Sequence, residues 1–248
     1  MSQGSGNPRT GGDTCDVARS GEEGVAEPAA FRNYWRRKKL LERGAPHFPV
    51  CRWWPSADLC ESERIYFDSV KGASSLLDVG AGDLRIKAKF RSAGYRGEYH
   101  TVDVGREHSH TYRDLAEVSR RYAAILLLDV IEHLPLSEGV AMLERLVELL
   151  DGGGTLVVVM PNARCIRNPF ALDMTHLHCY NINDLWAYLT SLGLETQGWR
   201  IVFGPPPSGP LQRVKFLAAA YVTSRVSGCD YADGIALIAR KPAAQESQ

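Results

Sequence analysis

One short segment, residues 75–90, constrains the fold of this chain more than any other. The apolar run Ser75–Val79 is followed by two glycines spaced one residue apart, Gly80 and Gly82, and then by residues with the pattern of a helix start. Glycine has no Cβ, so such a turn can be tight and lets a ligand approach the backbone. A strand, a glycine turn and a helix N-terminus in this order predict the ligand-binding opening of a doubly wound α/β sheet.

A carboxylate at the end of the same strand indicates which ligand the turn accepts. Turns that bind dinucleotides have the pattern Gly-x-Gly-x-x-Gly, because their backbone must receive an anionic pyrophosphate. Here Arg85 takes the third glycine position, and Asp78 ends the strand. Asp78 would repel a phosphate, but it suits a ligand that carries an ammonium group and no phosphate. We therefore expect no binding of NAD.

The rest of the chain alternates between strand patterns and helix patterns. Besides 75–79, strand patterns occur at 99–104, 111–115, 123–128, 155–160, 197–203 and 234–240. The run 123–128 is continuously apolar, as expected for a parallel strand that is covered on both faces. Amphipathic spacing typical of helices lies between these segments, for example at 183–193 and 211–225. We predict an α/β fold: a doubly wound, seven-stranded, mostly parallel sheet of Rossmann-like type with an N-terminal helical extension.

The order of these motifs resembles the class I S-adenosylmethionine-dependent methyltransferases. Asp78-x-Gly80-x-Gly82 matches the first motif of that family, and Asp103 at the end of the second strand matches its ribose-binding acid. The resemblance covers residues 75–242. It departs from the family at Leu84, where a third glycine is common.

Two further segments resemble particular members of this family. The run 129–134, Asp-Val-Ile-Glu-His-Leu, and the glycines before the fifth strand resemble the subgroup that contains the ubiquinone-type O-methyltransferases. The segment Asp173-x-Thr175-His176-x-x-x-Tyr180 is similar to one in many bacterial small-molecule methyltransferases. In this family the last two strands form an antiparallel edge, and residues inserted between them line the acceptor pocket.

The resemblance implies that S-adenosylmethionine is the cofactor. This ligand carries an ammonium group, a sulfonium and an adenosine, which agrees with the charge that Asp78 favours. Asp103 would accept hydrogen bonds from the ribose hydroxyls, and Asp114 from the exocyclic amine of adenine. The predicted cofactor-binding residues are Asp78, Gly80, Gly82, Asp103, Asp114 and Asp129.

Histidines follow the fourth and fifth strands, at the edge where ligands bind in doubly wound folds. Methyl transfer to a hydroxyl benefits from a base that works near neutral pH, and histidine is the side chain that meets this need. We predict His133 and His176 as the catalytic residues. For His133, a role in fixing the loop against the cofactor is the alternative, and His178 is expected to be an ordinary surface residue.

The same region could instead hold a divalent cation. Carboxylate and imidazole ligands are available from Glu132, His133 and His176, with Asp129 nearby. The set resembles that of RNA 3′-terminal 2′-O-methyltransferases, which have Glu at the position of Asp129. Because Asp129 reaches one methylene less far, we predict that no metal is required.

These observations predict an enzyme that transfers a methyl group from S-adenosylmethionine to a small-molecule acceptor, on a hydroxyl oxygen. The alternatives are N-methylation, metal-dependent 2′-O-methylation of RNA, and an inactive cofactor-binding subunit of a larger enzyme. The sequence does not identify the acceptor or the oligomeric state.

Charge and cysteine content limit the partners and the location that we expect. Lys plus Arg and Asp plus Glu are 29 each, so the chain has no net charge that would attract nucleic acid or an anionic membrane. No apolar run approaches the roughly 20 residues of a membrane span. The six cysteines form no Cys-x-x-Cys pair and the start is polar, so we expect a cytoplasmic protein without a signal peptide.

Composition divides the chain into three parts. Residues 1–30 are rich in Gly and Ser and poor in large apolar groups, which predicts a disordered tail. Residues 31–72 are expected to form a helical lid segment, with Phe31 and Trp35 packed on the core. Binding of RNA by this basic, aromatic helix is the alternative. Residues 73–242 form the predicted methyltransferase domain, with an insertion at 204–233 near the acceptor pocket.

Overall fold

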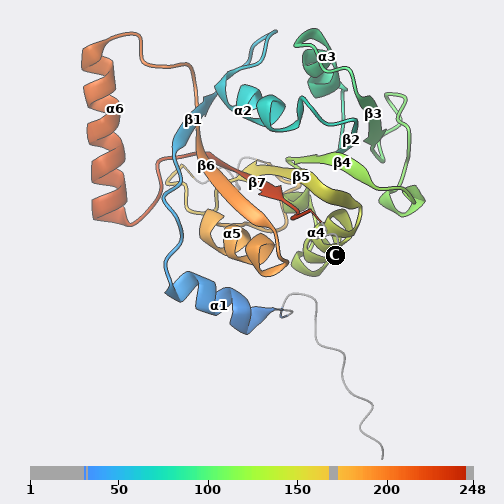
Figure 1. Ribbon diagram of the computed structural model, residues 1–248. Helices are drawn as coiled ribbons and strands as arrows, with labels where there is room; N and C mark the ends of the chain where they lie inside the picture. The colour runs from blue at the N-terminus through green and yellow to red at the C-terminus, as the bar shows by residue number, and fades with distance from the viewer. Residues whose placement is uncertain (1–30, 32, 168–172, 244–248) are drawn as a thin grey trace, which may run out of the picture.

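The computed structural model describes residues 31, 33–167 and 173–243; the predicted tail 1–30 lies outside them. The described part of the chain contains a seven-stranded sheet with helices on both faces (Figure 1). The strand order is β1-β6-β7-β5-β4-β2-β3. The strands are β1 (Val50–Trp53), β2 (Ser75–Val79), β3 (Glu98–Val102), β4 (Tyr122–Leu128), β5 (Leu150–Pro161), β6 (Glu195–Phe203) and β7 (Gly234–Arg240).

The sheet is mostly parallel, as predicted. Only β7, which lies between β5 and β6, runs antiparallel to its neighbours. The strand β4, which lies between β5 and β2, is buried over most of its length, in agreement with its continuously apolar sequence. The predicted doubly wound α/β architecture is therefore confirmed.

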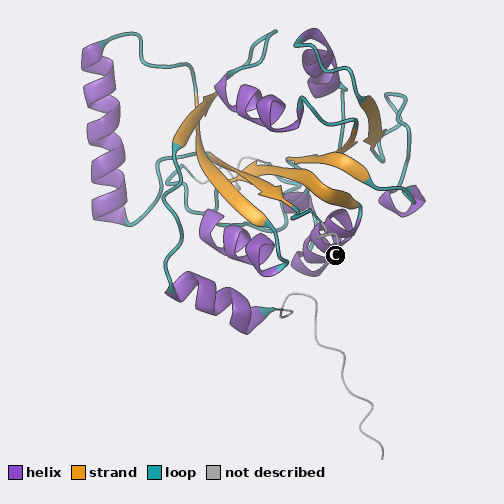
Figure 2. Ribbon diagram, viewed as in Figure 1, coloured by secondary structure: helices purple, strands orange, loops and turns teal. Residues whose placement is uncertain are grey.

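Helices cover both faces of the sheet, and the sheet separates the hydrophobic core into two layers (Figure 2). On one face lie α2 (Glu61–Val70) and α3 (Arg85–Ser92), and on the other lie α4 (Leu136–Glu148) and α5 (Ile182–Ser191). Because side chains alternate along a strand, Leu76 packs with Phe67 and Phe90, whereas Leu77 packs with Leu143 and Leu185.

The seven strands are not the seven that the sequence predicts. Segment 111–115 forms only an isolated bridge from Tyr112 to Val102, and it then enters the short 3₁₀ helix η2 (Leu115–Glu117), which Asp114 caps. The missing strand is replaced at the opposite edge by β1, which pairs in parallel with β6. The helical lid segment expected at residues 31–72 includes no strand at this position. The pairing of β1 is decided by tertiary contacts, which bury Cys51.

The addition of β1 also corrects the expected sheet edge. The last two strands do not form it, since β1 covers β6. A smaller difference concerns β5, which begins at Leu150 and not at Thr155. The glycine run joins the strand irregularly, with Gly153 at φ +78° and its N–H donating to the carbonyl of Lys241.

The helix α1 (Tyr34–Glu42) packs against α5 and not over the sheet edge. The expected burial of Phe31 and Trp35 is wrong, because these side chains are 54% and 74% exposed. The helical period places Tyr34 and Leu41, which are half-buried, on one face, and it turns the adjacent Trp35 outward.

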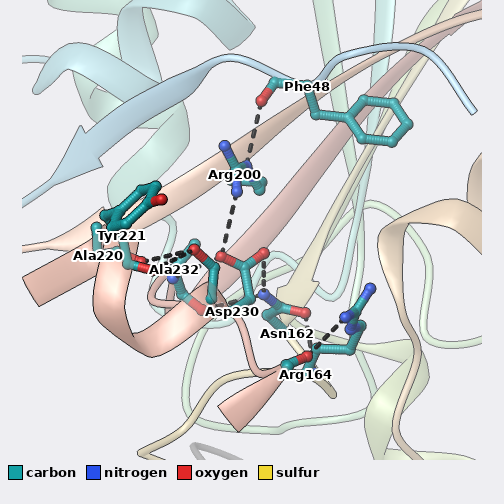
Figure 3. A network of polar contacts seen from close by, with 10 residues as sticks. Phe48, Asn162, Arg164, Arg200, Ala220, Tyr221, Asp230 and Ala232 are labelled. Carbon is teal, nitrogen blue, oxygen red and sulfur yellow. Dashed lines mark hydrogen bonds and ion pairs between the residues drawn. The ribbon is translucent and has the colours of Figure 1, made fainter. Parts of the chain in front are cut away.

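The insertion between β6 and β7 contains α6 (Pro210–Val222) and the π-helical turn η5 (Thr223–Ser227). A polar network connects the end of this insertion, just before β7, to the sheet (Figure 3). Asp230 accepts hydrogen bonds from Asn162 Nδ2 at 3.1 Å and from Arg200 Nη1 at 3.4 Å. The Arg200 Nε donates in turn to the carbonyl of Phe48 at 3.2 Å. One carboxylate therefore joins the insertion to the end of β5 and, through β6, to the N-terminal segment.

Candidate active site

The glycine turn after β2 has the geometry that its sequence predicts. Gly80 and Gly82 have φ values of +75° and +46°, which favour glycine. A Cβ on Gly80 would lie 2.2 Å from Cγ2 of Val130, so the turn is in direct contact with the loop after β4. A Cβ on Gly82 would meet nothing within 4 Å. This leaves the backbone at Gly82 open on the side where a ligand can approach.

The family's third glycine position is also in the left-handed region. Leu84, which stands there, has φ +62° and precedes the first residue of α3. A left-handed Leu is strained by about 1–2 kcal/mol. The turn geometry is thus kept although the glycine is not.

A cavity of about 540 Å³ opens beside this turn. It lies at the carboxyl ends of β2, β4 and β5, which is where doubly wound sheets bind ligands. Of the residues predicted from the sequence, those that line it are Asp78, Gly80, Gly82, Asp129, Glu132, His133 and His176. The sheet topology therefore brings together the predicted cofactor turn and the predicted catalytic histidines.

Asp103 and Asp114 are not among the lining residues. Asp103 lies at the rim, where its Oδ2 accepts the N–H of Gly82 at 2.7 Å and its Oδ1 accepts that of Gly105 at 2.7 Å. Asp114 accepts the N–H of Ala116 as the cap of η2. Their contacts with ribose and adenine stay predictions.

The carboxylate of Asp78 is buried at the floor of the cavity. It is 2% exposed and accepts a hydrogen bond from the Tyr99 hydroxyl at 2.7 Å. Burial raises its pKa to about 6, and the hydrogen bond from Tyr99 opposes that shift only in part. A cationic ligand would stabilise the ionised form, so the site is suited to an ammonium group.

Residues of the N-terminal segment complete this half of the cavity. Trp53 of β1 lines it, an aromatic residue that the sequence suggests for the wall of an acceptor pocket, and so do Glu63 and Tyr66 of α2, which the sequence did not indicate. Glu63 is held by a buried ion pair, with its Oε2 2.7 Å from Lys89 Nζ. β1 pairs with β6 and α2 packs against β1, and no local motif in the sequence predicts that pairing. Trp53, Glu63 and Tyr66 are the part of the expected lid segment that lines the cavity, since α1 contributes no lining residue.

The half of the cavity that contains the predicted catalytic histidines has a chain of three polar side chains. The Thr175 hydroxyl donates to Oδ1 of Asp173 at 2.6 Å and lies 2.8 Å from His133 Nδ1. A hydroxyl has one proton, and here Asp173 receives it, so Thr175 accepts the Nδ1–H of His133. The other ring nitrogen, Nε2, is then the one without a proton. In this tautomer, Nε2 is the ring nitrogen with a free lone pair.

His176 and Glu132 lie beside His133. The two imidazole rings are in edge contact, with centroids 4.8 Å apart. Ligand atoms of Glu132, His133 and His176 all lie within 4.8 Å of one another. Neither carboxylate oxygen of Glu132 accepts a hydrogen bond from another described residue, and the side chain is 2% exposed. Burial, with a smaller effect of Asp129, raises its pKa to about 8.

Asp129 connects the two halves of the cavity. It follows β4 in the left-handed region with φ +53°, a conformation that Asp tolerates better than most residues. Burial raises its pKa to about 6, and the nearby charges of Arg85 and His133 act in the opposite direction. The insertion at 204–233 contributes only its flanks, since Phe203 and Gly234 line the cavity and the residues between them do not.

The solved structures to which this chain is similar include S-adenosylmethionine-dependent methyltransferases. One from Archaeoglobus fulgidus superimposes with a TM-score of 0.55 at 18% identity, over 73% of this chain and 91% of that one. The magnesium protoporphyrin IX methyltransferase from Synechocystis PCC 6803, with S-adenosylmethionine bound, gives 0.46 at 16% identity over 73% and 76%. An O-methyltransferase family protein from Burkholderia thailandensis gives 0.47 at 12% identity over 74% and 57%.

No protein-family model matches the sequence, and the comparison with curated proteins gives no match either. The structural likeness nevertheless establishes the architecture. The fold is that of the class I S-adenosylmethionine-dependent methyltransferases, as the sequence motifs predict.

Proposed function

We propose that this protein transfers a methyl group from S-adenosylmethionine to a hydroxyl oxygen of a small-molecule acceptor. One observation carries the proposal: a single cavity joins the acid and glycine turn of β2 to the chain His133–Thr175–Asp173. The first half suits a cationic cofactor, and the second suits removal of a proton from an acceptor.

The residues present fit the cofactor in charge and shape. Asp78 offers a buried carboxylate to an ammonium group, and Gly82 offers an unobstructed backbone. Among the described lining residues, Arg85 is the one with a permanent positive charge, which suits an α-carboxylate. When bound, the cofactor supplies an electrophilic methyl group on a sulfonium.

His133 is the proposed general base. Its Nε2 takes the proton of the acceptor hydroxyl, and its Nδ1–H stays bonded to Thr175. The negative charge of Asp173, passed on through the Thr175 hydroxyl, stabilises the imidazolium that forms. His176, in edge contact with His133, limits the orientations that the ring can adopt.

Apolar side chains form the wall on the β1 and β6 side. Trp53 and Phe203 are in ring contact, with centroids 5.1 Å apart, and both line the cavity. Ile201 extends the same wall. A wall of this kind favours an acceptor with an aromatic or aliphatic body next to its hydroxyl.

A metal-dependent reaction is a second candidate because of Glu132. A buried carboxylate without a hydrogen-bond partner is costly unless it is neutralised or binds a cation. Glu132, His133 and His176 would hold a divalent ion with one oxygen and two nitrogen ligands. Such an ion would lower the pKa of an acceptor hydroxyl, and Thr175 would orient His133 from behind.

The proposal is tested by turnover of the full-length protein with a panel of hydroxyl and amine acceptors, measured as formation of S-adenosylhomocysteine. We expect turnover with hydroxyl acceptors, a loss of roughly 10²–10⁴-fold in His133→Ala, and no effect of a chelator. Loss of activity with a chelator, restored by Mg²⁺ or Mn²⁺, would show that a metal ion activates the acceptor and that His133 is not the general base. Turnover of amines alone, with full activity in His133→Ala, would indicate an N-methyltransferase. Cofactor binding without any turnover would favour an inactive partner subunit.

A further inference from the structure

α6 stands at the side of the molecule and buries none of its residues (Figure 1). Its contact with the fold runs along one face, where Phe216, Ala220 and Thr223 are half-buried. Phe216 forms an edge contact with Tyr231, and the Arg52 guanidinium lies over its ring. The spacing of four and three residues places this contact on a single helix face.

The opposite face of α6 is apolar and turned to solvent. Leu211, Val214, Leu217 and Tyr221 are between 62% and 66% exposed, and Val222 is 54% exposed. Spacings of three and four residues put the first four in one row. A soluble protein seldom leaves such a row uncovered unless it meets a partner.

The charges around this row have one sign. Arg213 and Lys215 lie on its two sides at the first turns, and Arg225 lies close to the far end. No Asp or Glu occurs between Phe203 and Asp230, although the whole chain has equal numbers of acids and bases. We propose that this face of α6 lies in the surface of an anionic lipid bilayer, with its apolar row in the acyl boundary and its cations among the headgroups.

This geometry is that of an interfacial helix, with an apolar face bordered by Lys and Arg. A second copy of the chain fits the surface less well, because pairing of two α6 faces would bring their cations together without an acid to neutralise them. The sequence-based expectation of no membrane partner rests on total charge and on the lack of a span. None of the helices in the described residues is long and apolar enough to cross a membrane, but a helix that lies in the surface needs no such length.

The test is co-sedimentation of the full-length protein with vesicles of phosphatidylcholine alone and of phosphatidylcholine with phosphatidylglycerol. We expect binding to the anionic vesicles that is roughly tenfold or more tighter than to the neutral ones, and that weakens in high salt. The double variant Val214→Asp/Leu217→Asp should bind at least tenfold more weakly. Both side chains are exposed, so its thermal midpoint should not change.

Val104→Asp is the matched control. Val104 is 84% exposed and follows β3, at the edge of the sheet opposite β1. The Val104→Asp variant should bind vesicles as tightly as the unaltered protein does. The proposal is overturned if neither vesicle is bound, if the double variant binds as well as its parent, or if Trp35→Ala in α1 abolishes binding instead. Concentration-dependent dimers that the double variant abolishes, without vesicle binding, would assign the face to a second copy. None of these readouts depends on methyl transfer.

Discussion

At the residue scale, Gly80 marks the contact between the glycine turn after β2 and the loop after β4. Its φ of +75° and the 2.2 Å that would separate a Cβ at this position from Val130 Cγ2 act together against any side chain. Gly82 has a positive φ but no steric neighbour. Both glycines are predicted from their spacing in the sequence. The fit of Gly80 against Val130 is not, because that contact joins two different strand ends.

We predict that Gly80→Ala lowers the free energy of unfolding by about 2–4 kcal/mol, from the clash and the left-handed strain combined. Gly82→Ala should cost only about 1 kcal/mol, because strain alone applies there. Thermal unfolding measures both. Adding Val130→Ala should recover part of the loss in Gly80→Ala and none in Gly82→Ala. Equal losses in the two single variants would show that the contact with Val130 is unimportant.

The chain from His133 to Asp173 gives a second prediction at this scale. Thr175→Val removes the acceptor of the His133 Nδ1–H, so kcat should fall by about tenfold or more while the dissociation constant of S-adenosylhomocysteine stays the same. Thr175→Ser keeps the hydroxyl and should restore most of the activity. Steady-state turnover together with calorimetry separates the two effects. A Thr175→Val variant with unchanged kcat would remove Thr175 and Asp173 from the mechanism.

At the scale of elements, the sequence predicts what local patterns decide and fails where tertiary contacts decide. β4 and β5 are predictable because continuous apolar runs have few alternatives. β1 is not predictable, because four residues flanked by prolines are too few to show the alternating pattern of a strand. Its strand conformation is decided by its pairing with β6. Segment 111–115 is expected as a short strand from its residue pattern, yet Asp114 caps η2 and the chain continues as that 3₁₀ helix.

The polar network at the end of the insertion gives a prediction at the scale of elements. Asp230, whose side chain is 14% exposed, joins Asn162, Arg200 and the N–H of Ala232. Asp230→Ala should lower the free energy of unfolding by about 2 kcal/mol, since it leaves half-buried donors unpaired. This corresponds to a fall of roughly 4–8 °C in the thermal midpoint.

Asp68→Ala is the control for that variant, because among the described residues Asp68 forms an ion pair with Lys71 alone, and both side chains lie at the surface. Its midpoint should change by no more than about 2 °C. If Asp230→Ala were as mild as Asp68→Ala, the network would not anchor the insertion.

At the scale of the whole molecule, the parallel sheet is the reason that distant motifs meet. Asp78, Asp129 and Pro161 lie at the carboxyl ends of three neighbouring strands. They therefore meet at the same edge of the sheet. This part of the site could be predicted from the sequence, because the order of strands and glycine turns implies a shared edge. The contribution of Glu63 and Tyr66 could not, since it depends on the position of the N-terminal segment beside that edge.

The most direct test is titration calorimetry of S-adenosylhomocysteine between pH 5 and pH 8. In the proposed site the ionised Asp78 would bind the ammonium group of the ligand, and burial raises the pKa of Asp78 to about 6. Affinity should therefore be constant above that pH and fall as the pH drops through it, because the proton then competes with the ligand. Asp78→Asn should bind about ten- to a hundredfold more weakly at pH 8 and show a smaller pH dependence, because Asp129, whose pKa is also raised to about 6, remains in the cavity; NAD should not bind. No binding of S-adenosylhomocysteine at millimolar concentration, or equal affinity in Asp78→Asn, would contradict the assignment of the cavity.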